Sequence, residues 1–202
     1  MPFVPSSSYL DKYFASESSF CQLYPLSIQQ LNEAHWSPLV IISKAVRFLA
    51  DKPGARILDI GSGCGKFCLA GAYYKPSAFF TGVEQRQYLT EQAIAARQKL
   101  GRLKAEFLCG NFTQADFRIY DSFYFYNSFF ENVDGSDKID DSISYSIGLY
   151  TYYNQILYTK LNATFPGTRL VTYKSLGFEI PPDFSLENTQ SDGHLKFWVK
   201  KR

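Results

Sequence analysis

The sequence predicts an α/β protein in which helices cover a mostly parallel β-sheet. Short apolar runs alternate with helical patterns between residues 56 and 126, and parallel strands need such helical crossovers. With 202 residues and 46% hydrophobic content, the chain can form one domain with a sizeable core. We expect that domain to span residues 51–202, and residues 1–50 to form a helical extension packed on it.

The extension is expected to be helical because apolar positions recur in it between breaking residues. Scattered apolar positions predict short helices over residues 9–20 and 27–32. A longer helix follows, with Ser37 as its expected N-cap and Pro38 at the first helical position. Pro53 and the glycine after it end this helix before the first strand.

The first strand and the turn after it form the central motif of the sequence. Residues 57–60 are a β-branched, apolar run typical of a buried strand, with Asp59 near its end. The following turn carries glycines at alternate positions, Gly61, Gly63 and Gly65. Residues 66–74 then have a helical pattern, so the helix N-terminus is expected to point free amides at a ligand held by the turn.

The glycine spacing separates two cofactor classes. Dinucleotide-binding turns read G-x-G-x-x-G, whereas this turn reads G-x-G-x-G directly after an acidic strand end. It resembles motif I of the class I, Rossmann-like S-adenosylmethionine-dependent methyltransferases. The resemblance implies that S-adenosyl-L-methionine is the cofactor and that Asp59 helps to hold its amino-acid end. The residues implied to cradle the cofactor are Gly61, Ser62, Gly63 and Gly65.

The second strand supplies the second acidic residue that this family needs. Residues 78–83 are a buried run that Glu84 terminates about twenty residues beyond the turn, the spacing of a ribose-binding carboxylate. Glu84 is implied to bind the ribose hydroxyls, with Gln85 beside it at the cofactor. An amphipathic helix with apolar positions from 89 to 100 follows and ends at Gly101.

The third strand, residues 105–109, leads to a candidate adenine site. In the family, an acidic or amide side chain at this place binds the adenine amino group and an apolar neighbour packs on the ring. Asn111 and Phe112 match these two roles. Asn after Gly is also ordinary turn chemistry, which is the alternative interpretation.

The fourth strand, residues 121–126, is expected to end at the site of methyl transfer. The resemblance implies that Asn127 is catalytic, that it contacts the cofactor and orients the acceptor beside it, and that Phe129 and Phe130 contact the substrate. Amino-group methyltransferases have two prolines between the Asn and the aromatic residue, and here Ser128 and Phe129 replace them. The segment is locally similar to the Asn-x-Phe of the non-SET-domain histone lysine methyltransferases. The alternative is that Asn127 only caps a turn.

The segment before the first strand is a candidate cover for the cofactor. In the family it often lies across the methionine end of the cofactor, which implies such a role for His35, Trp36 and Ser37, with Trp36 assigned to substrate binding. The alternative is that Trp36 is a hydrophobic staple and Ser37 merely a helix cap.

The C-terminal third is expected to complete the sheet. A polar loop over residues 131–141 precedes a tyrosine-rich helix, which Asp140 or Asp141 caps and which runs to Leu161. Further strands are expected over residues 168–173, 178–180 and 194–199. The resemblance implies a three-layer sandwich with seven strands, mostly parallel, the last one antiparallel.

The predicted function is transfer of a methyl group from S-adenosyl-L-methionine to an unidentified acceptor, with an amine of a protein lysine or a small molecule favoured. The alternatives are a catalytically silent cofactor-binding scaffold and an NAD(P)-dependent oxidoreductase. No side chain identifies itself as a general base.

Charge and composition bear on the partners. The formal net charge is only +2, so the sequence gives no strong nucleic-acid signal, and the expected acceptor is a protein or a small molecule. No apolar run is long enough for a membrane span, and no secretory signal is recognised, so a cytoplasmic location without membrane partners is expected. Four cysteines with few histidines favour free thiols and no metal site.

Overall fold

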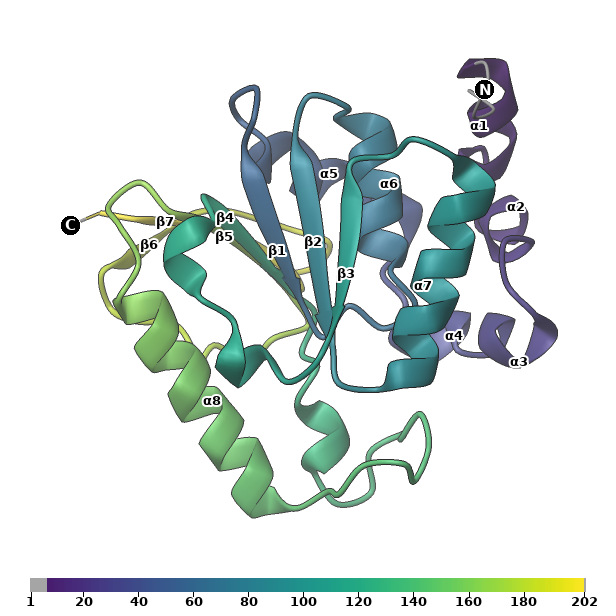
Figure 1. Cartoon of the computed structure of the whole chain (residues 1–202). Coiled ribbons are helices and arrows are strands. Elements are labelled where there is room, and N and C mark those ends of the chain that lie inside the picture. Colours follow the sequence, from purple (N-terminus) through teal and green to yellow (C-terminus); the bar gives the residue numbers. More distant parts are fainter. Residues whose placement is uncertain (1–6, 202) are drawn as a thin grey trace.

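A seven-stranded sheet forms the centre of the computed structural model, which describes residues 7–201 (Figure 1). The strand order is β3-β2-β1-β4-β5-β7-β6. Strands β1 to β5 pair in parallel, and β7 pairs antiparallel with both β5 and β6. The strands are β1 (Arg56–Ile60), β2 (Phe79–Glu84), β3 (Ala105–Cys109), β4 (Ser122–Phe125), β5 (Arg169–Tyr173), β6 (Phe184–Gln190) and β7 (Leu195–Lys200).

Helices cover both faces of this sheet, so the predicted three-layer α/β fold is confirmed. One face carries α5 (Leu39–Leu49), α6 (Lys66–Tyr74) and α7 (Gln87–Leu100). The other face carries α8 (Ile147–Asn162) and the short 3-10 helices η1 (Phe112–Gln114), η2 (Phe117–Ile119) and η3 (Phe130–Asn132).

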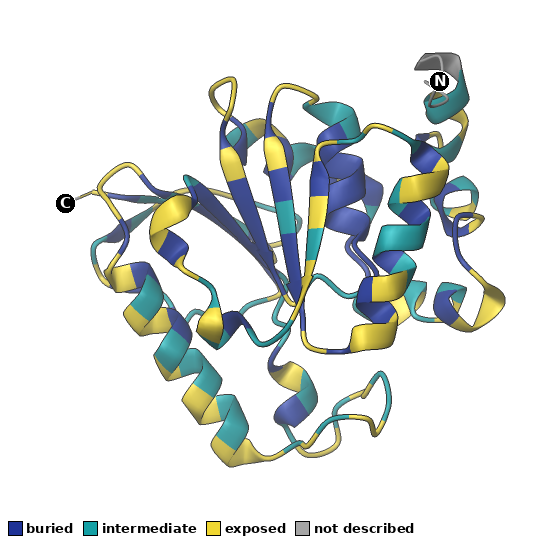
Figure 2. Ribbon diagram, in the orientation of Figure 1, coloured by how far each residue is buried: buried dark blue, intermediate teal, exposed yellow. Residues whose placement is uncertain are grey.

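Alternate strand residues supply two separate cores. Ile57 packs with the helices on the α5, α6 and α7 side, and Leu58 packs with Leu157 and Leu161 of α8. The β-strand period of two directs successive side chains to opposite faces, which is why a near-continuous apolar run marks a strand buried on both sides. Figure 2 shows α6 and most of the central strands buried, whereas the edge strand β3 is largely exposed and exposed residues lie on the outer sides of α7 and α8.

The order of the strands on the two sides of β1 determines where the site forms. From β1 the chain crosses to β2 on one side, and β4 pairs with β1 on the other side. At such a switch in strand order a crevice opens beyond the carboxyl ends of the strands. The glycine turn after β1 lies at this crevice.

The N-terminal helices pack beside α6 and share its core. They are α1 (Ser7–Phe14), α2 (Glu17–Cys21), α3 (Leu26–Gln29) and α4 (Asn32–His35). Lys66 ties them to the glycine turn, because its buried ammonium group pairs with Glu17 and donates to Asn32 Oδ1 at 3.1 Å. The division between an extension over residues 1–50 and a domain over residues 51–202 stays a prediction.

The helix after Pro38 starts differently from its prediction. Ser37 does not cap it: α5 begins at Leu39 with Pro38 as N-cap, and Glu17 accepts a hydrogen bond from the Leu39 amide. The Ser37 hydroxyl instead bonds the Tyr124 hydroxyl at 2.6 Å inside the protein. The expected helices over residues 9–20 and 27–32 are each split, into α1 with α2 and α3 with α4.

Two C-terminal elements also differ. The tyrosine-rich helix begins at Ile147 with Ser146 as its cap, because the Asp140 carboxylate is already bonded to Ser142 and Arg86. The prediction of a strand over residues 178–180 is wrong, because this segment folds as a turn. Besides β5, the antiparallel partner of β7 is β6, which the sequence did not indicate because most of its residues are polar.

No helix in the described part of the chain is long and apolar enough to cross a membrane. The cytoplasmic location expected from the sequence stays a prediction.

The contribution of the Lys66 contacts to the stability of the protein can be measured. We expect Lys66→Met to lower the free energy of unfolding by about 1–3 kcal/mol, because bonds to charged groups contribute about that much and Glu17 loses its cation. Urea unfolding followed by circular dichroism measures the change. Lys52→Met is the control, since Lys52 is 60% exposed in its pair with Asp121 and should matter by less than about 1 kcal/mol. Equal losses in the two variants would contradict the role of Lys66.

Candidate functional site

The glycine turn lies tightly against the segment that follows β4. Gly61 has φ 73°, and a Cβ atom there would lie 2.5 Å from the side chain of Ser128. The Ser128 hydroxyl in turn donates to the Ile60 carbonyl at 2.7 Å. Only glycine allows this approach, and it fixes the end of β4 against the end of β1.

Gly63 serves the other side of the turn. It has φ 53°, and a Cβ atom there would meet no atom within 4 Å, so the backbone is left uncovered toward open space. Its N–H donates to the Glu84 carboxylate at 3.0 Å. The turn is therefore bound to β2 while its outer edge remains free for a ligand.

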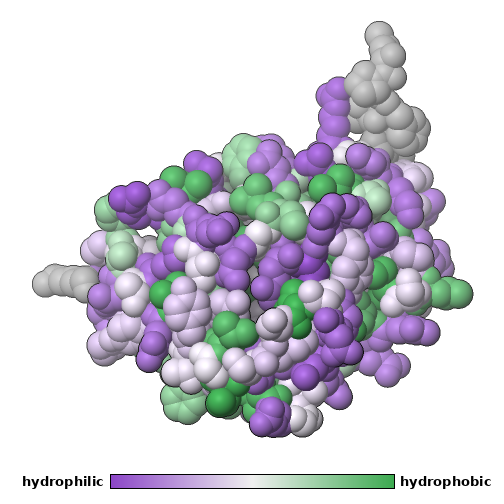
Figure 3. All heavy atoms as spheres, turned by 60° about the horizontal axis from the view of Figure 1, so that its bottom comes forward, coloured by the Kyte–Doolittle hydropathy of each residue, from purple (hydrophilic) through white to green (hydrophobic). Residues whose placement is uncertain are grey.

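A cavity of about 440 Å³ opens beyond the strand ends, within the range of about 300–1,000 Å³ usual for small-molecule sites. Figure 3 turns this side of the molecule forward and shows the surface hollowed near its middle. Of the residues proposed from the sequence, those that line the cavity are His35, Trp36, Ser37, Asp59, Gly61, Ser62, Gly63, Glu84, Gln85, Asn111, Phe112, Asn127, Phe129 and Phe130.

Gly65 is the exception. It does not line the cavity but forms the N-cap of α6 at φ 85°. A Cβ atom there would lie 2.5 Å from the ring of Phe107 on β3 and 2.8 Å from Ala93 on α7. The third glycine of the motif thus serves packing between elements rather than contact with a ligand.

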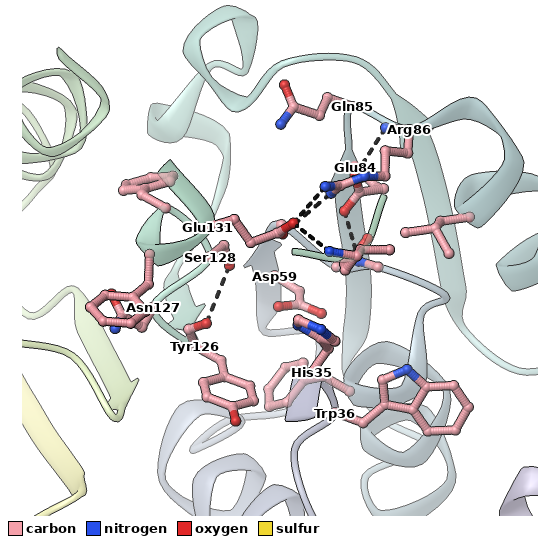
Figure 4. A pocket seen from close by; sticks show the side chains of 18 of the residues that line it. His35, Trp36, Asp59, Glu84, Gln85, Arg86, Tyr126, Asn127, Ser128 and Glu131 are labelled. Atoms are coloured by element: carbon pink, nitrogen blue, oxygen red, sulfur yellow. Dashed lines mark hydrogen bonds and ion pairs between the residues drawn. The ribbon is translucent and has the colours of Figure 1, made fainter. Parts of the chain in front are cut away.

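Two buried carboxyl groups lie at the cavity, Asp59 on β1 and Glu84 on β2 (Figure 4). Burial raises the pKa of Glu84, although the amides of Arg86 and Gly63 donate to its carboxylate. Burial also raises the pKa of Asp59 well above its ordinary value, and the nearby Glu84 charge adds to this. The pair offers oxygen acceptors at two points of the cavity wall.

The adenine site proposed from the sequence lies at the cavity as well. The Asn111 amide donates to the Tyr153 hydroxyl at 3.0 Å, and its oxygen accepts from the Thr113 N–H at the start of η1. Phe112 stacks on Phe129 with ring centroids 4.9 Å apart. The Asn111 side chain is thus held in place by α8 and η1 at the cavity wall.

The segment after β4 carries a strained backbone. Asn127 has φ 35°, a region that non-glycine residues rarely adopt and that Asn tolerates best. Its carbonyl accepts a hydrogen bond from the Phe130 N–H at 3.0 Å, which closes a turn. Within residues 7–201 its side-chain amide has no hydrogen-bond partner. The turn interpretation of Asn127 therefore describes its backbone, while its side chain is left at the cavity.

The N-terminal segment forms one wall. The Tyr126 hydroxyl, just beyond β4, donates to the Ala34 carbonyl at 3.1 Å, which holds α4 against the cavity. Trp36 is 7% exposed and packs on the rings of Phe20 and Tyr24, so most of its surface belongs to the core. His35 lines the cavity, and burial lowers the pKa of its imidazole.

Arg86 holds the opposite wall. Its guanidinium donates to Glu131 at 2.6 Å, to Asp140 at 3.2 Å and to the Tyr145 hydroxyl at 2.6 Å. Burial alone would lower the pKa of Arg86, but the charge and hydrogen bond of Glu131 outweigh it and raise that pKa. One buried cation thus fastens residues 131–145 beside Glu84 (Figure 4).

Sequence reasoning missed Arg86 and the residues that it binds. The signal was present: residues 131–141 carry five acidic side chains and one lysine, which is more negative charge than a loop folded onto the protein holds without a cation. Lys66 was missed for a similar reason, because nothing near it in the sequence indicates that its ammonium group is buried.

The chain was compared with protein families and curated proteins. The family model of protein-L-isoaspartate(D-aspartate) O-methyltransferases matches residues 1–125. Among curated proteins, tRNA (guanine-N(7)-)-methyltransferases from Synechococcus sp. strains JA-3-3Ab and JA-2-3B'a(2-13) are 50% and 48% identical over 54 residues. This match covers 27% of this chain, and the chain spans about a quarter of the length of those relatives, 23%.

Solved structures share the fold. TrmN from Thermus thermophilus superposes with a TM-score of 0.58 at 18% identity, over 82% of this chain and 49% of that chain. An RNA methyltransferase from Salinibacter ruber, in complex with S-adenosyl-L-homocysteine, gives 0.55 at 20% identity, over 83% of this chain and 94% of that chain. The expected fold class is therefore correct, and the glycine spacing was right to favour a methyltransferase over an oxidoreductase.

The expectation about partners is wrong. The modest net charge gave no nucleic-acid signal and favoured a protein or small-molecule acceptor, but the curated relatives are named tRNA methyltransferases and one of the similar structures is an RNA methyltransferase. Net charge averages over the whole surface, so it does not report on the small area around one site.

The cavity fits S-adenosyl-L-methionine, the cofactor of this class of enzyme. Glu84 offers a carboxylate where ribose hydroxyls can donate, and the turn beside Gly63 is free of side chains. The Ser62 hydroxyl is buried with no partner in the described part of the chain, and it lies against Gly82 of β2, where a Cβ atom would be 2.5 Å from it. The residues that hold each part of the cofactor stay proposals.

The role of Glu84 predicts a pH dependence. We expect Glu84→Gln to weaken S-adenosyl-L-homocysteine by about tenfold, because a hydrogen bond to a charged group is replaced by a neutral one. Because burial raises the pKa of Glu84, wild-type affinity should fall on acidification before an ordinary carboxyl group would protonate. Calorimetric titration across pH measures both effects. A variant with the same pH dependence as the wild type would remove Glu84 from the binding site.

The role of Arg86 predicts that its substitution weakens binding of S-adenosyl-L-homocysteine, and that the size of the effect depends on the new side chain. Arg86→Met leaves Glu131 and Asp140 without their buried cation, so residues 131–145 should detach from the cavity and S-adenosyl-L-homocysteine should bind about tenfold or more weakly. Arg86→Lys should restore part of the affinity, since it keeps the charge but not the fork of donors. Arg169→Met is the matched control, since its pair with Asp51 is on the surface. Unchanged affinity in Arg86→Met would contradict the role.

Proposed function

We propose that this chain, which belongs to the protein-L-isoaspartate(D-aspartate) O-methyltransferase family and is an S-adenosylmethionine-dependent methyltransferase, methylates a base of an RNA. The first candidate for that RNA is tRNA. The observation that carries this proposal is the 50% identity over 54 residues with a tRNA (guanine-N(7)-)-methyltransferase.

The family name does not extend to the acceptor. The matched residues end at Phe125, the last residue of β4, so the segment around Asn127 and the whole of α8 lie outside the match. The matched part contains the glycine turn and the acidic strand ends to which we assign the cofactor. We therefore infer the chemistry of the acceptor from the residues beyond Phe125.

Those residues give the acceptor side an aromatic wall. Phe129 is only 5% exposed because it packs among the rings of Phe112, Phe125 and Tyr153, so it supports this wall from behind; Tyr126 and Phe130 line the same cavity and are the rings left accessible to a ligand. A flat base gains stacking energy on such rings whatever its sequence context. A base inside a duplex cannot reach a cavity of this kind, so an unpaired or flipped base is required.

The chain's own residues then bind, orient and shield. S-adenosyl-L-methionine supplies a methyl group already activated on a sulfonium centre. Glu84 and Asp59 hold the ligand through their carboxyl groups, and the free amide of Asn127 donates to or accepts from the edge of the base. The wall held by Tyr126 and the wall held by Arg86 exclude water on opposite sides. No covalent nucleophile is needed.

An open cavity also argues against the silent-scaffold alternative. The mark of that alternative would be a cavity blocked at Asn127, but Asn127 lines an open space of about 440 Å³.

The test is transfer of tritiated methyl groups from the cofactor to purified unmodified tRNA. We expect the wild type to label it, and Asn127→Ala to bind S-adenosyl-L-homocysteine normally while losing about 100-fold in turnover, since orientation of an acceptor contributes on that scale. Asn188→Ala is the matched control, because Asn188 is an exposed amide on the edge strand β6 and lines neither hollow of the protein. Labelling of a protein or a small metabolite in place of tRNA would overturn the proposal. Equal loss of binding and turnover would make Asn127 structural.

A further inference from the structure

A second hollow of about 580 Å³ lies between α8 and the segment that follows β5. We name it the α8 groove. Tyr150, Asn154 and Tyr158 form a stripe along α8, because residues four apart share one side of a helix at steps of about 6 Å. Gln155 lies beside this stripe, and Phe178 closes the groove from the other side.

The segment over residues 174–180 is built to expose apolar side chains. Glu179 is 2% exposed and accepts a hydrogen bond from the Ser175 hydroxyl, which also accepts from the Gly177 N–H at 3.0 Å. The same turn leaves Leu176 58% and Phe178 72% exposed. Large apolar side chains held outward by a hydrogen-bonded turn indicate a contact surface.

The α8 groove continues the cavity of the cofactor. Lys174 and Leu176 line that cavity, and Phe178, two residues further on, lines the groove. On α8, Tyr153 lines the cavity, and Tyr150, three residues before it, lines the groove. A polymer with one unit in the cavity would therefore have its neighbouring units over the groove.

The groove's chemistry suits unpaired nucleotides. Its rings offer stacking surfaces, and the amides of Asn154 and Gln155 offer donors and acceptors to base edges. No carboxylate is among its lining residues; Glu179, whose charge reaches Tyr150, is buried behind the turn, and that burial raises the pKa of Glu179. At the junction with the cavity, the Lys174 ammonium group lies 5.7 Å from the ring of Tyr126 and supplies a cation.

We propose that the α8 groove binds the unpaired nucleotides next to the target base of the RNA by stacking them on Phe178, Tyr150 and Tyr158. This inference rests on the proposed function and adds to it a requirement for single-stranded RNA around the target. It also gives a function to tyrosines of α8 that are not fully buried: Tyr150 packs against the core with part of its surface exposed, and Tyr158 is 37% exposed.

The experiment measures binding of a fluorescently labelled single-stranded RNA of mixed sequence to the protein saturated with S-adenosyl-L-homocysteine, at fixed salt. We expect Phe178→Ala and Tyr158→Ala each to weaken this RNA by about tenfold, because one stacking surface is lost. Neither variant should change affinity for S-adenosyl-L-homocysteine. Phe165→Ala is the matched control, a 63% exposed phenylalanine in the turn after α8 that should leave RNA binding unchanged.

Each other outcome overturns the proposal in a distinguishable way. If both variants bind and methylate RNA as the wild type does, the α8 groove does not bind the RNA, although the enzyme still acts on RNA. If the wild type neither binds nor methylates RNA, the proposed function fails and the groove proposal fails with it. If instead a polypeptide is labelled and Phe178→Ala reduces that labelling, the groove holds a protein substrate.

Discussion

The buried carboxylate of Glu84 is the group on which both sides of the site depend. It accepts the Gly63 N–H at 3.0 Å and the Arg86 N–H at 2.9 Å, so one side chain binds the glycine turn and fixes the start of the segment that carries Arg86. Burying this carboxylate without hydrogen-bond donors would cost free energy. The two N–H groups therefore stabilise its charged form at the cavity wall. The Arg86 guanidinium, 3.8 Å from the same carboxylate, then fastens residues 131–145.

The second constraint is closure from the N-terminal side. Lys66 at the start of α6 and Tyr126 after β4 come from different edges of the site, yet both bond to the segment just before α5, at Asn32 and Ala34. Because the sheet ends in an open crevice, the site has walls only where other segments are held against it. Hydrogen bonds to fixed elements thus enclose the cavity on the side proposed for the cofactor, and residues after β4 and on α8 line the side proposed for the acceptor.

The two sides also differ in how they were built. The cofactor side uses tight backbone contacts, such as that of Gly61 with Ser128, which allow little variation. The acceptor side uses rings and an exposed turn around the buried Glu179. Binding residues are commonly found on loops that a rigid scaffold positions, so one scaffold can serve different acceptors. This division explains how a family match that ends at Phe125 is compatible with an acceptor different from the one in the family's name.

The sequence by itself determined β1, the glycine turn, α6 and the acidic ends of β1 and β2, because these depend on patterns within a few residues: strand and helix periods and the steric needs of glycine. Tertiary structure decided the rest. Arg86 meets Glu131 across 45 positions and Tyr126 meets Ala34 across 92, and no local pattern encodes such pairs. Ser37 looked like a cap and became a buried partner of Tyr124, since the chain's packing brought a hydroxyl within reach. The strand β6 was hidden for the same reason: it is a strand because β7 lies beside it, and its apolar alternation is limited to Phe184 and Leu186 before four polar residues.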